Sequence, residues 1–188
     1  YKHYSNRVVS NFLEKSAENG IEIFRTFDAL NDFENIDFTI REVKRIGKHA
    51  QGTIAYTTSP VHDLNTWLDL AKKIEDAGAD SLAIKDMAGL LRPFDAYELV
   101  KNLKSTLSIP IHMQTHATTG MSTATNMKAI EAGIDNIDTS ISSLSMTYGH
   151  TATETMLAIF ENQQREINLD LSALEEVSIF FKQIRDKY

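Results

Sequence analysis

Short apolar runs alternate along the chain with longer amphipathic segments. Five of the short runs are rich in Ile, Val, Ala and Thr and have the length of β-strands, so they predict strands. The segments between them repeat apolar residues every three to four positions, which is typical of helices that bury one side. The predicted strands are residues 21–27, 52–58, 81–85, 109–116 and 136–141.

The clearest predicted helix covers residues 63–77. Its apolar positions form one stripe, and its lysines and acidic residues point outward. Two other helices are predicted over residues 6–19 and 170–187. Three helices end in closely similar sequence motifs that contain glycine, the residue favoured for a left-handed C-cap. These glycines are Gly20, Gly78 and Gly133.

Strand and helix alternate with a period of about 29 residues, which is close to the size of one unit of a (β/α)8 barrel. Eight such units need roughly 230 residues. The chain has 188 residues and carries five predicted strands. It therefore predicts an α/β fold that is a partial TIM (β/α)8 barrel of about five βα units with parallel strands. A doubly wound sheet is the geometric alternative, but no Gly-rich phosphate loop follows any of the strands.

Composition and charge narrow the range of functions. The chain has no cysteine, which excludes disulfides, thiolate metal sites and a cysteine nucleophile, and fits a cytoplasmic location. The net charge of -7 is spread along the chain without a basic stripe, which argues against nucleic acid and anionic membranes as partners. No apolar run is long enough to span a bilayer. A small-molecule enzyme or a part of a protein assembly remains.

Polar residues gather at the ends of the predicted strands, where parallel barrels place their reacting groups. On the fourth strand His112, Gln114 and His116 share one face because side chains alternate with a period of two. Imidazole nitrogens suit Zn, Mn or Co, so a metal site is one interpretation. Hydrogen-bonded core residues are the other, and the spacing alone favours it. The strand ends carry Asp28, Thr57, Thr58, Lys85, Asp86, Gln114, His116, Asp138, Thr139 and Ser140.

Lys85 and Asp86 end the third predicted strand. The simplest interpretation is an ion pair that bridges neighbouring strands. An ammonium ion cannot bind a metal, but reaction with CO2 would turn Lys85 into a carbamate with anionic oxygen ligands. Burial that lowers the pKa of the amine would favour this reaction.

Three strings of the sequence match one known family. They are residues 24–32 (FRTFDALND), 84–93 (IKDMAGLLRP) and 138–154 (DTSISSLSMTYGHTATE), and they occur in the right order. The sequence resembles the carboxyltransferase domain shared by pyruvate carboxylase, the oxaloacetate decarboxylase alpha subunit and transcarboxylase. The resemblance covers nearly everything up to about Asn162. Residues 117–120 (ATTG) are more similar to the decarboxylase and transcarboxylase branch.

The resemblance implies a barrel with a divalent metal (Zn, Mn or Co) at its mouth, bound by an Asp, a carbamylated Lys and a His-x-His pair. Lys85 takes the place of the carbamylated lysine and His116 that of the second histidine, with Lys85 and Asp86 as expected catalytic residues. The metal would organise a pocket where pyruvate, as an enolate, takes CO2 from carboxybiotin, or where oxaloacetate loses it. The expected substrate-binding and biotin-binding residues are Tyr1, Asp28 and Thr119.

The sequence departs from this family at position 114, where Gln114 replaces the first histidine and is the third expected metal ligand. An amide oxygen binds Zn more weakly than imidazole does, although Mn or Mg tolerate it. His112 lies one step deeper on the strand, about 6.6 Å away. The resemblance places the metal-binding Asp and an Arg-Gly motif upstream of Tyr1, and a proton-shuttling threonine downstream. Residues 149–150 (Gly-His) resemble part of a strand-to-helix loop, where a structural role is expected.

The sequence therefore predicts a fragment of a biotin-dependent carboxyltransferase or decarboxylase. Residues 1–165 are expected to form the partial barrel and residues 166–188 a C-terminal helix that leads toward a further region. Biotin would come from a carrier protein or domain, and a homo-oligomer or larger complex is expected, without nucleic acid or direct membrane insertion. One alternative is a metal-dependent barrel lyase or synthase acting on 2-oxo acids, which usually lacks the KDMAG string. The other is a degenerate, non-catalytic barrel segment, which Gln114 favours.

Overall fold

A parallel sheet of five strands forms the centre of the molecule. The structure is a computed structural model that describes residues 3–161 and 167–188. The strands lie side by side in chain order, β1-β2-β3-β4-β5, and a helix connects each neighbouring pair. The strands are β1 (Ile23–Thr26), β2 (His49–Ala55), β3 (Ser81–Asp86), β4 (Ile111–Thr115) and β5 (Asn136–Ile137).

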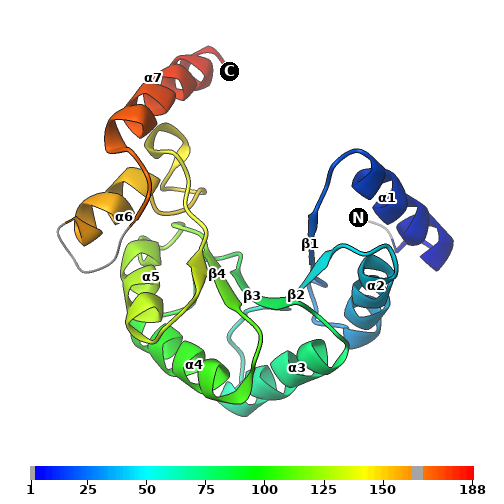
Figure 1. The fold of residues 1–188 in the computed structure, drawn as a ribbon. Coiled ribbons are helices and arrows are strands. Elements are labelled where there is room, and N and C mark those ends of the chain that lie inside the picture. Colours follow the sequence, from blue (N-terminus) through cyan, green and yellow to red (C-terminus); the bar gives the residue numbers. More distant parts are fainter. Residues whose placement is uncertain (1–2, 162–166) are drawn as a thin grey trace.

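The helices cover the outer side of an open arc, and the strands line its inner side (Figure 1). Helices α1 and α7 lie at the two ends of this arc. A doubly wound sheet would carry helices on both faces, so the expected partial (β/α)8 barrel is confirmed. The helices are α1 (Asn6–Glu18), α2 (Phe33–Arg45), α3 (Leu64–Asp76), α4 (Pro93–Thr106), α5 (Ser122–Glu131), the 3-10 turn η1 (Ser142–Leu144), α6 (Thr153–Phe160) and α7 (Leu171–Lys187).

The two faces of the sheet differ in chemistry. Gly52 faces the helices so closely that an added Cβ would lie 2.3 Å from Ile74 of α3. Leu82 and Ile111 are in register with Gly52 and are fully buried on the same face. Intervening positions such as Gln51 turn to the inner face because strand side chains alternate. The core thus lies between sheet and helices, and polar groups collect inside the arc.

The three predicted glycine C-caps lead into a repeated connection. Gly20, Gly78 and Gly133 have φ angles of 97°, 96° and 95°. Two residues after Gly78, Asp80 accepts a hydrogen bond of 2.8 Å from Ala50 N in β2. In the same way, an aspartate two residues after Gly133 accepts a hydrogen bond from the first residue of β4. At two of its three occurrences the sequence repeat therefore ties the start of a strand, β3 or β5, to the start of the strand before it.

The strand boundaries differ from the prediction, most clearly for β2. This strand covers His49–Ala55 rather than residues 52–58. The Asn31 side chain donates to Ala55 O at 2.9 Å and accepts from Ala55 N at 2.8 Å, so it takes the backbone groups that would continue the sheet. The fifth strand is also shorter than predicted, since Ser140 pairs with Ala152 instead.

The C-terminal helix α7 contacts the loop that precedes α6. Ser178 of α7 lies 2.7 Å from Ser142, and Arg185 donates to Ser143 O at 2.8 Å. The expected division after residue 165 falls among residues 162–166, outside the described residues, and stays a prediction. Across residues 3–161 and 167–188, no helix is both long enough and apolar enough to cross a membrane.

Candidate functional site

The three predicted metal ligands meet at the carboxyl ends of β3 and β4. Lys85 is in register with Gln114, and its Nζ donates to Gln114 Oε1 at 2.9 Å. Gln114 Nε2 lies 3.3 Å from His116 Nε2. The amide therefore bridges the ammonium group and the imidazole. His112 does not join this group, because its Nε2 is hydrogen-bonded to Asp138.

Lys85 is partly enclosed by its neighbours. Its Nζ lies 5.0 Å from the centre of the Phe27 ring. Burial, followed by the positive charge of Arg25, lowers the pKa of the Lys85 amine, while the negative charge of Asp138 acts in the opposite direction. A lowered pKa increases the fraction of neutral amine, which is the form that reacts with CO2.

Asp86 lies on the opposite face of β3 from Lys85, because successive strand residues point to opposite faces. Its side chain is fully buried. Oδ1 accepts from Leu90 N at 2.8 Å, and Oδ2 accepts from Leu91 N at 3.0 Å and from Thr115 Oγ1 at 2.8 Å. Asp86 thus holds the β3–α4 loop onto the end of β4, away from the Lys85 amine.

Gly89 and Thr119 join two neighbouring loops at the mouth of the arc. Gly89 has a φ of 67°, and a Cβ there would lie 2.6 Å from His116 O, so only glycine fits without strain. Thr119 Oγ1 donates to Gly89 O at 2.6 Å. The hydroxyl predicted to bind substrate or biotin is therefore used here to fasten the β4–α5 loop to the β3–α4 loop.

Asp28 organises the loop between β1 and α2. Its Oδ1 accepts from Asp32 N at 3.0 Å and its Oδ2 accepts from Asn35 Nδ2 at 3.1 Å. The hydrogen bond from Asp32 N outweighs burial and lowers the pKa of the Asp28 carboxyl. Asp28 also lines a hollow of about 1010 Å³ between the N-terminal segment and α2. Tyr1, which was also expected to bind substrate or biotin, lies outside the described residues.

An ionic network on the inner face joins the first strand to the segment after the last. Arg25 Nη1 lies 2.5 Å from Asp138 Oδ2, and Arg25 Nε donates to Gln51 of β2. His112 of β4 contacts the other oxygen of Asp138. Asp138 was expected at a strand end from the sequence, but Arg25 was not among the predicted site residues. The signal was its position directly after Phe24, since alternation turns Arg25 away from the buried face.

The network predicts an acid-sensitive contribution to stability. Burial acts to raise the pKa of Asp138, but hydrogen bonds from His112 and Arg25 outweigh it and hold the pKa well below its usual range. The stabilisation is therefore fully present above the unfolded-state pKa of about 4 and is lost as the pH falls toward the folded-state pKa. We expect Asp138→Asn to lower the Tm by about 6 °C at pH 7, since both partners are partly exposed.

Calorimetry from pH 7 down to pH 2 checks this prediction. The difference in Tm between the wild type and Asp138→Asn should shrink below about pH 4. The exposed Asp69 provides the matched control, and Asp69→Asn should leave the whole profile unchanged. A difference in Tm that stays constant with pH would contradict the ionic contribution.

The loop between η1 and α6 covers the end of β4. His116 Nδ1 donates to Tyr148 O at 2.7 Å. His150 Nδ1 donates to Thr115 O at 3.0 Å. The rings of His116 and His150 lie 4.6 Å apart, measured between their centres. The histidine of residues 149–150, for which the sequence indicated only a loop role, therefore lies directly beside a predicted metal ligand.

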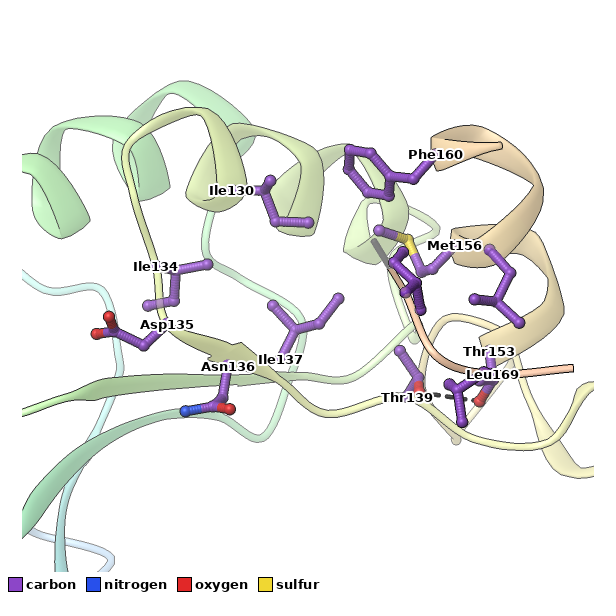
Figure 2. Close-up of a pocket in the computed structure, with 12 residues that line it drawn as sticks. Ile130, Ile134, Asp135, Asn136, Ile137, Thr139, Thr153, Met156, Phe160 and Leu169 are labelled. Carbon is purple, nitrogen blue, oxygen red and sulfur yellow. Dashed lines mark hydrogen bonds between the residues drawn. The ribbon is translucent and has the colours of Figure 1, made fainter. Parts of the chain in front are cut away.

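An apolar cavity of about 310 Å³ lies between β5, α5 and α6 (Figure 2). Ile130, Ile137, Met156 and Phe160 are among its lining residues. Of the polar residues expected at the strand ends, Thr139 alone lines it. The cavity is therefore separate from the group that Lys85, Gln114 and His116 form.

The donor chemistry around Lys85 fits a divalent cation under two conditions. Among the described residues, no three His, Asp or Glu side chains are grouped so that they could hold a metal. His116 offers an imidazole nitrogen, and Gln114 offers a neutral oxygen that at present accepts from Lys85. Lys85 becomes a ligand only as a carbamate. The residues thus fit a metal once Lys85 has reacted with CO2 and the amide of Gln114 has turned.

Comparison with known proteins gives the family. A family model described as HMGL-like matches residues 19–180. The chain belongs to the HMGL-like family. Over its whole length, it is 45% identical to a pyruvate carboxylase subunit of Methanocaldococcus jannaschii. It is 47% identical to the methylmalonyl-CoA carboxyltransferase 5S subunit of Propionibacterium freudenreichii subsp. shermanii. The chain spans 33% and 38% of the lengths of these two relatives.

Solved structures of the family agree in fold. The carboxyl transferase domain from Rhizobium etli pyruvate carboxylase with pyruvate superposes with a TM-score of 0.95 at 34% identity. The match covers 98% of this chain and 32% of that one. The resemblance to the carboxyltransferase domain of biotin-dependent enzymes is confirmed, and this HMGL-like chain corresponds to one part of such a domain.

Proposed function

We propose that this chain is part of a biotin-dependent carboxyltransferase that moves CO2 between carboxybiotin and pyruvate or oxaloacetate. The observation that carries the proposal is the meeting of Lys85, Gln114 and His116 at the ends of two neighbouring strands. Relatives named as pyruvate carboxylase and carboxyltransferase subunits support it. The chain spans about a third of these relatives, so the proposal includes further βα units that complete the barrel in the whole protein.

Lys85 has the central role in this proposal. The neutral amine attacks CO2, a nitrogen–carbon bond forms, and a proton leaves, which gives an anionic carbamate. As an ammonium group, Lys85 donates to Gln114 Oε1. As a carbamate it would accept from Gln114 Nε2 instead, because a carboxylate-like group cannot donate. The charge of Lys85 would thus decide which end of the amide faces His116.

A divalent cation, Zn, Mn or Co, would be held by the Lys85 carbamate, His116 Nε2 and Gln114 Oε1. When bound, it supplies a Lewis acid that stabilises the negative charge of an enolate. Asp86 and Thr119 are proposed as positioning residues, because their hydrogen bonds hold the two loops that flank these ligands. Asp28 fixes a third loop, beside the hollow that we propose for substrate or biotin.

The partners follow from the same reaction. Biotin would arrive on a carrier protein or domain, and pyruvate or oxaloacetate would bind at the mouth of the barrel. A homo-oligomer or larger complex and a cytoplasmic location are also part of this proposal. Direct insertion into a membrane and binding of nucleic acid are not.

Metal analysis and turnover of the full-length protein test the proposal. We expect about one divalent ion per chain and decarboxylation of oxaloacetate that requires both this ion and biotin on a carrier. Turnover that needs the metal but not biotin would favour a metal-dependent barrel lyase. A folded protein with neither metal nor turnover would be a degenerate barrel segment.

A further inference from the structure

Two histidine rings lie side by side at the mouth of the arc, and only one belongs to the predicted ligand set. His116 ends β4, and His150 comes from the loop before α6. Their ring centres are 4.6 Å apart and their planes are inclined by 39°. Two imidazoles that bind one ion at metal–nitrogen distances of about 2.1 Å have ring centres about 4.6 Å apart at a right ligand angle and about 5.3 Å apart at a tetrahedral one. The observed separation is compatible with a shared ion.

Both rings direct the same nitrogen, Nδ1, at a backbone carbonyl oxygen. His116 Nδ1 is 2.7 Å from Tyr148 O, and His150 Nδ1 is 3.0 Å from Thr115 O. A backbone carbonyl only accepts hydrogen bonds, so each Nδ1 carries the proton. The lone pair of His150 Nε2 is therefore available, whereas that of His116 Nε2 faces Gln114 Nε2 at 3.3 Å, a contact that is lost when the amide turns. Histidines that bind metals usually donate their other ring N–H to such a group. His150 therefore has the hydrogen bonding of a ligand and not only of a loop residue.

The loop that carries His150 is fastened to the candidate site. Gly149 O accepts from Ala117 N at 2.8 Å, and His150 O accepts from Met146 N at 2.8 Å. A Cβ on Gly149 would lie 2.7 Å from Leu144 O, so the chain turns tightly there. These contacts hold His150 against the end of β4.

We propose that His150 Nε2 is a metal-binding atom that supplies the imidazole which Gln114 cannot. An amide oxygen is a weak ligand for Zn or Co compared with an imidazole nitrogen. Among the residues already assigned to the site, His116 is the one imidazole donor. The inference rests on the proposed function, because it adds a ligand to the same metal site.

Proton NMR of the full-length protein loaded with Co²⁺ counts the imidazole ligands directly. Each coordinated histidine gives one strongly shifted Nδ1–H signal that disappears in D2O. The wild type should show separate signals from His116 and His150, and His150→Gln should lose one of them. The same variant should bind Co²⁺ about 100-fold more weakly. Loss of a residue that is only hydrogen-bonded to a metal ligand costs about 10- to 100-fold in affinity, so the loss of a ligand itself should reach or exceed that range.

A second substitution separates a ligand from a loop residue. In a Gln114→His background, the new imidazole at position 114 serves as the second imidazole ligand. His150→Gln should then weaken Co²⁺ binding less than threefold. A residue that only shapes the loop would cost the same in both backgrounds, which would overturn the inference. His62 provides the matched control, because it is also hydrogen-bonded and stacked on a ring, but on the β2–α3 loop.

The outcomes distinguish this inference from the proposed function. If the wild type binds Co²⁺ and His150→Gln changes neither the signals nor the affinity, the inference is wrong and the proposed metal site stands. If the wild type binds no Co²⁺ under CO2-saturated buffer, both are wrong. His62→Gln should leave the signals and the affinity unchanged.

Discussion

Lys85→Ala is expected to lower kcat for carboxyl transfer in the full-length protein by about 1,000-fold. The substitution removes the amine that forms the carbamate. Of the three proposed ligands Lys85, Gln114 and His116, only Lys85 can supply an anionic oxygen. Metal content should fall in parallel. Steady-state oxaloacetate decarboxylation and metal analysis on one sample measure both quantities.

Two further variants sharpen this prediction. Lys85→Arg keeps the positive charge but forms no carbamate, so it should be as inactive as Lys85→Ala. Added formate or acetate should restore part of the activity of Lys85→Ala, because a free carboxylate can occupy the place of the carbamate. Lys101→Ala, an exposed lysine beside Tyr97, should keep full activity. Activity in Lys85→Arg would mean that the charge of Lys85, and not its carbamate, is what matters.

Asp86→Ala is expected to destabilise the domain by about 4 kcal/mol, which corresponds to a fall in Tm of about 10 °C. The carboxylate is fully buried and accepts three hydrogen bonds, so its loss leaves three donors without an acceptor, two of them buried. Amide hydrogen exchange should accelerate first at Leu90 and Leu91, whose N–H groups are released. Calorimetry together with exchange at these two residues measures the effect.

Asp86→Asn helps to decide between a positioning and a catalytic role. One amide oxygen can still accept, so the loss of Tm should be about half that of the alanine variant. Asp76→Ala is the control, because Asp76 is exposed on α3 and pairs with a surface lysine. An Asp86→Asn protein that keeps its Tm and metal but loses turnover would make Asp86 catalytic, as the sequence analysis expected.

Most of the architecture could be predicted from the sequence, because it depends on local signals. The glycines that end helices and the aspartate that caps α3 act within a few residues of their own position. The boundary of β2 could not be predicted, because it depends on Asn31, a loop residue that reaches Ala55 through its side chain. Residues that are distant in sequence thus decide where a strand ends.

The candidate site shows the same division. The period of two on β4 places Gln114 and His116 on one face, and the strand ends bring Lys85 to them. The hydrogen bonds of Asp86 toward the other face follow from the same alternation, although adjacency in sequence suggested that it acts with Lys85. The approach of His150 to His116 depends on the path of a long loop, for which spacing gives no rule.

The pair of Arg25 and Asp138 has a consequence for how the arc folds. The two residues are 113 positions apart and bring together β1 and the segment after β5. Contacts between distant positions form late, because the chain between them must first be ordered. The pair can close only when the four strands between the two residues, β2 to β5, have their final curvature. It then makes the two ends of the sheet interdependent, so that fraying at one end loosens the other.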